Sequence, residues 1–375
     1  MDERAQLRKW LCELALPLWA DRGYDRARAR FAERLTFECE PVRDVPLRLM
    51  VQARQVAVFC DAERLGWMTG SGEPALAAAH SMIEDFQGKG DLGGWAFACD
   101  ENGQVVDTTP DLYAHAFALY ALSHCHRLDP TGPWLATARD TLAFVQSHFA
   151  HPGGGYLPAL PAPQHLAQNP LMHLLEALLD LFEASGEDQF ANHARDLASL
   201  AVTRMIDPAT GALPEAFDGD WNPRAENLGN WVEPGHQYEW IWLLDRAERL
   251  LGGDHGDAID GLHRFAVAHG IDAAGFLVDE VEPDGAPRKT SRRLWPHTEG
   301  LRAERLLARR GNPSTSTRVE AFARRLREGF LATAPAGGWV DRIDAAGAPL
   351  SPDMPASSLY HLAGAIEVLG EMPPA

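Results

Sequence analysis

Apolar and polar residues follow two kinds of helical pattern along this chain, and the two kinds occur in pairs. Helices of the first kind have one polar face, as in Trp134 to Phe149, Phe190 to Met205, Ala258 to His269 and Arg318 to Phe330. Helices of the second kind are apolar or small on most faces, as in the segment LYAHAFALYAL that begins at Leu112. A helix with one apolar face lies at a surface, whereas a helix that is apolar all round is buried. The pattern therefore predicts an outer layer and an inner layer of helices.

The second kind of pattern occurs six times, so six inner helices are expected. They run from Leu49 to Leu65, Leu112 to Cys125, Pro170 to Glu183, Gly235 to Leu251, Pro296 to Arg309 and Ser358 to Leu369. A glycine turn such as Gly93-Gly94-Trp95 separates each outer helix from its inner partner, and the turns recur at intervals of roughly 60 residues, the length of a helix-pair repeat. After two of these turns, apolar triplets precede Asp100-Glu101-Asn102-Gly103 and Pro283-Asp284-Gly285, a pattern that predicts β-hairpins.

Six helix pairs predict an all-α fold, a closed (α/α)6 toroid (barrel) with short β-hairpins in the loops at one end. An open solenoid of helix pairs is the alternative, because stacked pairs need not close into a ring. We find no linker and no low-complexity tract, so residues 1–375 are expected to form a single catalytic domain.

A polar residue lies near the start of each inner helix, at a similar offset from the preceding turn. These residues are Arg54, His115, His173, His236, His297 and His361. In a toroid the starts of the inner helices converge at one end, so the six side chains are expected to share a functional cavity. Two of the histidines belong to an HxxE pattern after a proline, His173 with Glu176 and His236 with Glu239. A carboxylate three residues on lies on the same helix face and can fix the imidazole tautomer. His361 has no carboxylate at that spacing, which suggests a role distinct from that of His236.

Several chemistries were weighed for this cavity. Di-metal sites use the order Glu-x-x-His, which is reversed here, and no HxxxH pair is present, so no metal is expected. Glycoside hydrolysis needs two carboxylates; Asp107, Asp111, Glu176, Glu239 or Glu299 could supply them, but the histidines would then have no role. No serine or cysteine lies in a nucleophile elbow.

Proton transfer at a carbon next to a carbonyl fits the histidines better. Two histidines can act as base and acid, and an arginine can stabilise an enediolate oxygen. Tryptophans near the loops could stack on a sugar or anchor a loop; these are Trp95, Trp231, Trp295 and Trp339.

Composition excludes other partners. A net charge of -19 over 375 residues argues against binding to nucleic acid, to an anionic membrane or to an anionic polymer.

The five cysteines are scattered without a CxxC pair, which fits the reducing cytosol. The apolar run from Leu14 to Trp19 contains Pro17 and lacks a cleavage site, so we interpret it as an amphipathic helix and not as a signal peptide. No segment is long and apolar enough to span a bilayer. We expect a cytoplasmic monomer or homodimer.

Four motifs, in this order, resemble the N-acylglucosamine 2-epimerase family, and the similarity extends over nearly the whole chain. They are Val51-Gln52-Ala53-Arg54-Gln55, Asn169-Pro170-Leu171-Met172-His173-Leu174-Leu175-Glu176, Glu233-Pro234-Gly235-His236-Gln237-Tyr238-Glu239-Trp240 and Pro355-Ala356-Ser357-Ser358-Leu359-Tyr360-His361. The resemblance implies an (α/α)6 barrel that interconverts sugars with no required metal or cofactor. It implies that His236 and His361 are the catalytic pair, acting through a cis-enediol intermediate, and that Arg54 contacts the substrate near the reacting oxygen. Expected substrate-binding residues are Tyr113, His115, Asn169, His173, Glu176, Glu239, Trp295 and His297.

Within the family, MPASSLYH and VQARQVAVF look most like the aldose–ketose isomerase branch, which predicts conversion of D-mannose to D-fructose. A sugar 2-epimerase acting on mannose and glucose or on N-acylated hexosamines is the alternative. A sugar-binding toroid without catalysis, or a glycosidase, is the second alternative. Arg292-Arg293 is the only basic pair near a pocket helix, so a free sugar is preferred to a phosphorylated one.

Overall fold

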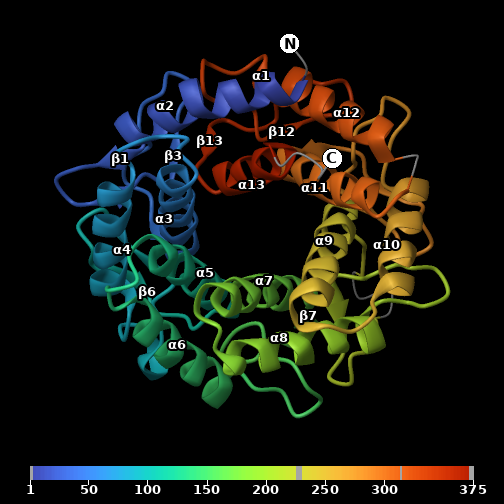
Figure 1. The fold of residues 1–375 in the computed structure, drawn as a ribbon, viewed down its shortest axis with the longest axis horizontal. Helices are drawn as coiled ribbons and strands as arrows, with labels where there is room; N and C mark the ends of the chain where they lie inside the picture. Colours follow the sequence, from blue (N-terminus) through green and yellow to red (C-terminus); the bar gives the residue numbers. More distant parts are fainter. Residues whose placement is uncertain (1–2, 225–229, 313–314, 371–375) are drawn as a thin grey trace.

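The computed structural model describes residues 3–224, 230–312 and 315–370, and its helices form two concentric rings (Figure 1). The inner ring consists of α3 (Leu49–Arg64), α5 (Leu112–Leu128), α7 (Gln168–Ser185), α9 (Pro234–Leu251), α11 (Leu294–Arg309) and α13 (Ser358–Gly370). All six predicted inner helices are confirmed, with bounds that agree to within three residues. The predicted toroid is therefore correct.

The outer ring contains the more polar helices. They are α1 (Glu3–Trp10), α2 (Leu16–Asp21), α4 (Gly72–Phe86), α6 (Trp134–His148), α8 (Asp188–Leu200), α10 (Gly256–His269) and α12 (Thr315–Arg325). π-Helical turns join α1 to α2 and extend α8 and α12; they cover Leu11–Ala15, Ala201–Met205 and Leu326–Leu331. Within the described residues, no helix is both long and apolar enough to cross a membrane.

Contacts between the first and last units close the ring. Helix α13 packs against α3, and α1 packs against both α12 and α13. Strand β13 (Met354–Pro355) pairs antiparallel with β3 (Arg34–Leu35), which joins segments more than 300 residues apart. An open solenoid would leave these faces apart, so the closed form is established. The prediction that residues 1–375 form one domain includes residues 1–2, 225–229, 313–314 and 371–375, which lie outside the described residues, and it stays a prediction.

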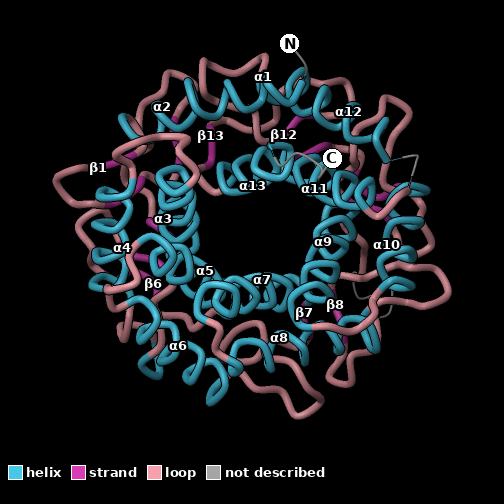
Figure 2. Tube along the Cα trace, in the orientation of Figure 1, coloured by secondary structure: helices cyan, strands magenta, loops and turns pink. Residues whose placement is uncertain are grey.

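The remaining strands are short and antiparallel. They are β1 (Tyr24–Asp25), β2 (Arg30–Phe31), β4 (Leu47–Arg48), β5 (Ala98–Cys99), β6 (Val105–Asp107), β7 (Leu166–Ala167), β8 (Ala216–Phe217), β9 (Glu280–Val281), β10 (Pro287–Lys289), β11 (Arg292–Arg293) and β12 (Arg342–Ile343). Seen along the axis of the toroid, β6, β8 and β12 lie between the two rings of helices (Figure 2). Strands β4, β7 and β11 end directly before α3, α7 and α11, so strands gather at the end of the toroid where inner helices begin.

Both predicted β-hairpins form, with their turns where they were expected. The first joins β5 to β6 around Asp100 to Gly103, and the second joins β9 to β10 around Pro283 to Gly285. The strands start after the apolar triplets, because these residues are used to anchor the loops. The Trp95 indole, for example, is buried and donates to Thr141 Oγ1 at 2.9 Å.

Polar side chains link neighbouring inner helices near their C-terminal ends. The pairs are Asp61 with His124 (3.0 Å), Arg127 with Asp180 (2.8 Å), Arg246 with Asp180 (2.8 Å), Arg310 with Asp245 (3.2 Å) and Arg64 with Glu367 (3.6 Å). Asp180 is the centre of this arrangement, since two guanidinium groups share its buried carboxylate. Burial opposes ionisation of this carboxyl group, but Arg246 and Arg127 hold its pKa well below the ordinary value.

We expect Asp180→Asn to lower the free energy of unfolding by about 3–5 kcal/mol, because it leaves two largely buried guanidinium groups without their shared counter-charge. Differential scanning calorimetry of the full chain measures the change. Asp140→Asn is the matched control, since Asp140 is exposed on α6 and its loss is expected to change stability by less than about 0.5 kcal/mol. Equal stabilities of the two variants would contradict a structural role for the Asp180 pairs.

Candidate active site

A cavity of about 280 Å³ lies at the end of the toroid where the inner helices begin. Its lining comes from the first two turns of all six inner helices, from residues just before them and from Asp341. Of the eleven side chains predicted for the site, eight line it: Arg54, Tyr113, Asn169, His173, His236, Glu239, Trp295 and His361. Residues from distant units therefore converge as the repeat pattern predicts.

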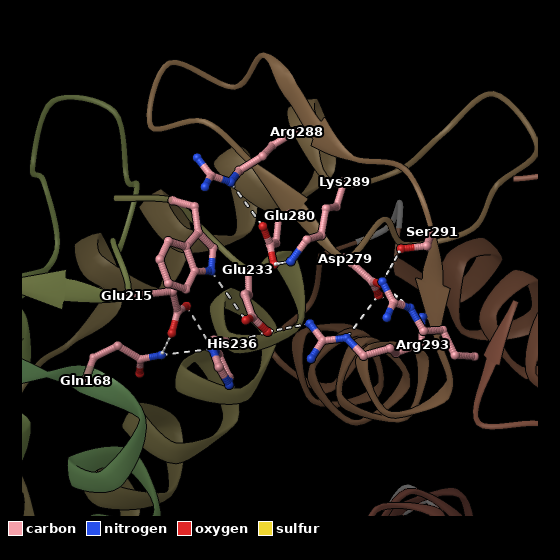
Figure 3. A network of polar contacts seen from close by, with 12 residues as sticks. Gln168, Glu215, Glu233, His236, Asp279, Glu280, Arg288, Lys289, Ser291 and Arg293 are labelled. Carbon is pink, nitrogen blue, oxygen red and sulfur yellow. Dashed lines mark hydrogen bonds and ion pairs between the residues drawn. The ribbon is translucent and has the colours of Figure 1, made fainter. Parts of the chain in front are cut away.

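His236, in the first turn of α9, is held by a carboxylate from another segment. Its Nδ1 lies 2.8 Å from Glu215 Oε1, and Gln168 Nε2 donates to the second oxygen of Glu215 at 2.8 Å (Figure 3). Glu233 lies further away, 3.9 Å from the same nitrogen, and its carboxylate accepts from Arg293 at 2.6 Å. The expectation that Glu239 holds His236 is wrong, because Glu239 lies beside His173 instead, at 3.7 Å.

His361, in the first turn of α13, also has a carboxylate partner. Its Nδ1 lies 2.8 Å from Glu299 Oε1, on the neighbouring helix α11. The other oxygen of Glu299 accepts from Trp242 Nε1 at 2.9 Å and from Arg302 at 3.2 Å. No carboxylate lies three residues from His361 in the sequence, and its partner comes from across a helix–helix interface and not from its own helix.

Trp295 lies against both histidines. Its ring centroid is 4.9 Å from that of His236 and 5.6 Å from that of His361. The close approach needs a glycine at position 235, since a Cβ there would lie 2.6 Å from the Trp295 ring. With Nδ1 of each histidine bonded to a carboxylate, Nε2 is the nitrogen that remains for a substrate.

The two histidines differ in proton affinity although each has a carboxylate. Burial works against a charged His236, but Glu215 and Glu233 more than offset it and raise the pKa of His236 above its ordinary value. Burial lowers the pKa of His361 to about 4, and Glu299 only partly compensates, because Arg54 and His173 also disfavour the charged form. At neutral pH the His361 imidazole is therefore neutral, and His236 binds a proton more tightly than His361 does.

Arg54 supplies a fixed positive charge at the cavity. Its guanidinium lies 4.0 Å from the centroid of the Phe117 ring and 4.9 Å from that of Tyr360. It also donates to the Tyr113 hydroxyl at 2.6 Å. Stacking and hydrogen bonding together leave the group little freedom, which suits stabilisation of a charge that develops at a defined place.

Glu239 and His173 lie close together in the lining of the cavity. Neither carboxylate oxygen of Glu239 has a hydrogen-bond partner among the residues that the structure describes. Burial raises the pKa of Glu239 well above its ordinary value, and the nearby carboxylates of Glu299 and Glu176 act in the same direction. A neutral carboxylic acid at this place can both donate to and accept from a hydroxyl group.

Three of the predicted site residues do not line this cavity. Glu176 lies one turn further along α7, where it holds His173 Nδ1 at 3.1 Å and accepts from the Tyr360 hydroxyl. It therefore positions His173, and the expectation that it lines the substrate cavity is corrected.

His115 and His297 have another role, and the expectation that they bind substrate is likewise corrected. Nε2 of each accepts from a backbone N–H of the preceding turn, from Trp95 at 3.2 Å and from Leu277 at 2.9 Å. Nδ1 of each bonds a backbone carbonyl, of Asp111 or Arg293, at 2.7 and 2.9 Å. Burial lowers the pKa of both to about 4. They are neutral side chains that fasten the turns to the inner helices.

Sequence reasoning missed several residues of the site. Met50, Glu233, Arg293, Asp341, Ser357 and Ser358 line the cavity, and Glu215 supports it from behind. Glu215 lies in a loop at no regular distance from His236, so no periodic signal marks it. Arg293 was noted only as a phosphate candidate, and it is already paired with Glu233 and Asp279. Of the four tryptophans proposed for stacking, only Trp295 reaches the cavity.

Among the residues that the structure describes, two groups of side chains have donor atoms within 4.8 Å of one another, close enough to hold a divalent cation. They are His173, Glu176 and Glu239, and Glu215, Glu233 and His236. In the second group Glu215 is already bonded to Gln168 and Glu233 to Arg293 (Figure 3).

Solved carbohydrate isomerases and epimerases have the same closed toroid, among them a D-mannose isomerase and a cellobiose 2-epimerase. Residues 31–365 match the family of N-acylglucosamine 2-epimerase (GlcNAc 2-epimerase), and the chain belongs to this family. It is an enzyme of the isomerase class.

The particular relatives include both kinds of activity. The chain is 34% identical to a mannose-6-phosphate isomerase of Rhizobium meliloti (strain 1021), covering 97% of this chain and 96% of the relative. It is 27% identical to a cellobiose 2-epimerase of Bacteroides fragilis, covering 67% and 68% of the two chains. A crystal structure of D-mannose isomerase has the same fold, with a TM-score of 0.87, 19% identity and coverage of 96% and 95%.

We expect Glu215→Gln to lower the pKa of His236, because it removes the nearest charge that favours the imidazolium. Nuclear magnetic resonance titration of histidine-labelled full chain measures the pKa. Glu233→Gln is the matched control, since Glu233 is 3.9 Å away and not 2.8 Å, and its effect is expected to be smaller. An unchanged His236 pKa in Glu215→Gln would contradict the assigned pairing.

Proposed function

We propose that this enzyme interconverts an aldose and a ketose, D-mannose and D-fructose first of all, by proton transfer through a cis-enediol. The observation that carries the proposal is the pair of histidines at one cavity, each with Nδ1 on a carboxylate but with opposite shifts of pKa. A neutral base, and a second imidazole that binds a proton more tightly, beside a fixed arginine are the groups that such a reaction needs.

In the proposed reaction, Nε2 of neutral His361 removes the proton from C2 of the open-chain aldose. The electron pair of the broken C–H bond forms the C1–C2 double bond, and O1 takes a proton from His236 to give the enediol. His361 then returns its proton to C1, while His236 recovers a proton from O2 as the C2 carbonyl forms. Arg54 stabilises the negative charge that passes between O1 and O2. Glu215 and Glu299 hold the two imidazole rings in the required tautomers.

Epimerisation at C2 is the second candidate, and the cellobiose 2-epimerase relative supports it. An epimerase returns the proton to C2 on the opposite face, so each histidine must serve as base in one direction. The unequal proton affinities of His236 and His361 favour one base and one acid, and therefore an isomerase.

A glycosidase is disfavoured by the state of the carboxylates that line the cavity. Glu233 is paired with Arg293. Burial raises the pKa of Glu239 and of Asp341 above the ordinary values. No two of these groups form the free acid and free base that glycoside hydrolysis uses.

Charge at the cavity supports a free sugar as substrate, although one relative is named for a phosphorylated sugar. Two arginines line the cavity. Arg293 is neutralised by Glu233 at 2.6 Å and by Asp279 at 3.0 Å, and Arg54 is assigned to the reacting oxygens, so neither is left to bind a phosphate. A phosphate dianion would also meet the carboxylate of Glu233, so its binding would be opposed.

The direct test is nuclear magnetic resonance of the purified enzyme with D-mannose, D-fructose and D-glucose in heavy water. We expect mannose and fructose to interconvert, with deuterium entering at the transferred position whenever the base exchanges with solvent. His236→Asn and His361→Asn should each lower kcat by about 10²- to 10⁴-fold, the typical contribution of a positioned acid or base. D-mannose 6-phosphate is expected to react more slowly than D-mannose.

Two results of this experiment would overturn the proposal. Near-normal turnover in both histidine variants would remove the assigned site. Formation of D-glucose from D-mannose without D-fructose would replace the isomerase by the epimerase. His115→Asn serves as the matched control, because His115 contacts backbone groups away from the cavity and its loss should act on stability.

The kcat/KM of the wild type should follow a bell-shaped dependence on pH. Activity falls at low pH as His361 takes up a proton, with a limb near its pKa of about 4. Activity falls at high pH as His236 loses its proton. Because the pKa of His236 is raised, this basic limb should lie above the ordinary histidine pKa of about 6.5. Glu215→Gln should move the basic limb to lower pH and leave the acidic limb in place. A shift of the acidic limb alone would reverse the two roles.

A further inference from the structure

A second and larger cavity, of about 390 Å³, lies at the opposite mouth of the toroid; we name it the rear cavity. It is lined by the C-terminal halves of the inner helices, with side chains that recur one helical turn apart. On α7 and α9, for example, they are Glu176, Asp180, Glu183, Trp242, Arg246 and Arg249. Glu176 and Tyr360 form its floor next to the layer that carries His173 and His361. The proposed reaction makes no use of this space.

The charges around the rear cavity nearly balance. Six arginines line it, against the five carboxyl groups of Asp61, Glu176, Asp180, Glu183 and Glu367. The inner helices also end here, and each helix C-terminus adds a partial negative charge. Counted as formal charges, neither sign dominates, and burial raises the pKa of Glu176 and of Glu367. An uncharged ligand also avoids the cost of being desolvated as an ion.

The hydrogen-bonding groups of the rear cavity are suited to hydroxyl groups. Arg127 and Arg246 each bond Asp180 and Glu183, and among the described residues these bonds use only the Nη2 atom of each arginine. The other nitrogens of the two guanidinium groups can therefore bond a ligand. Carboxylates beside them accept, so adjacent groups of a diol can donate and accept at once. Tyr120, Trp242 and Tyr360 add aromatic rings to the lining.

Ring closure alone does not account for the space. Ion pairs between neighbouring helices need only contact, and protein interiors are otherwise packed closely. Here the pairs surround a cavity larger than the candidate active site. We propose that the rear cavity is a second binding site, for an uncharged polyhydroxylated ligand of monosaccharide size. The proposal is independent of the reaction at the other mouth.

Trp242 lines the rear cavity and Trp295 lines the candidate active site. Because Trp242 also donates to Glu299 beside His361, its response is assigned to the rear cavity only where a rear-cavity variant weakens it. The full chain is labelled with 5-fluorotryptophan, and its fluorine resonances are assigned with Trp242→Phe and Trp295→Phe. The probe is methyl α-D-mannopyranoside, an uncharged sugar whose ring cannot open and which therefore cannot isomerise. We expect the Trp242 resonance to shift in a saturable way as the glycoside is added, whereas inorganic phosphate should leave it unchanged.

Variants decide whether the rear cavity causes the shift. Arg246→Gln should raise the Kd measured from the Trp242 response about tenfold or more, as expected for loss of a charge-assisted hydrogen-bonding group. Arg64→Gln is the second variant should Arg246→Gln fail to fold. Arg139→Gln, which removes the same charge from an ion pair with Glu187 between outer helices, should leave the response unchanged.

Three outcomes would overturn the proposal. They are no Trp242 response to the glycoside in the wild type, a response to phosphate in its place, and an equal response in the wild type and in both rear-cavity variants. The measurement follows the fluorine resonance of Trp242 with a glycoside that cannot isomerise, so its outcome does not depend on whether the enzyme converts mannose to fructose.

Discussion

Closure of the inner ring is the constraint on which the rest of this structure depends. Once α13 packs against α3 and β13 pairs with β3, the starts of six helices must face one mouth and their ends the other. Each helix start then contributes a first-turn residue to a common space, so Arg54, His236 and His361 meet although they lie far apart in the chain. The polar pairs near the helix ends, centred on Asp180, hold the same ring from the other side.

The two candidate catalytic histidines illustrate how similar local chemistry can have different consequences. Each imidazole has a carboxylate 2.8 Å from Nδ1. Around His236 a second carboxylate, Glu233, adds to the first, whereas Glu299 beside His361 is shared with Trp242 and Arg302. Arg54 and His173 also disfavour a charged His361, so burial prevails there. The different proton affinities of the two histidines follow from these neighbours and not from the imidazoles themselves.

Buried charge is arranged in layers along the axis of the toroid. Among the described residues Glu239 has no hydrogen-bond partner, and burial raises its pKa, while Glu176 one layer below bonds His173 and Tyr360. This layer separates the two cavities, so the groups at one mouth can be tuned for proton transfer while those at the other remain ionised pairs.

The sequence by itself determined the fold and the main members of the candidate site. Helix periodicity marked the six inner helices, and the repeated offset of polar residues, together with the family motifs, pointed to Arg54, His236 and His361. These signals are local, because a helix face is set by residue spacing alone.

Tertiary structure decided which carboxylate each histidine contacts. The HxxE spacing placed Glu239 near His236 in sequence, but the partners are Glu215 from a loop and Glu299 from a neighbouring helix. It also decided that His115 and His297, which have the same offset as the others, bind backbone groups of the turns. Spacing gives the direction of a side chain on its own helix, whereas its partners depend on which distant segments the closed ring brings beside it.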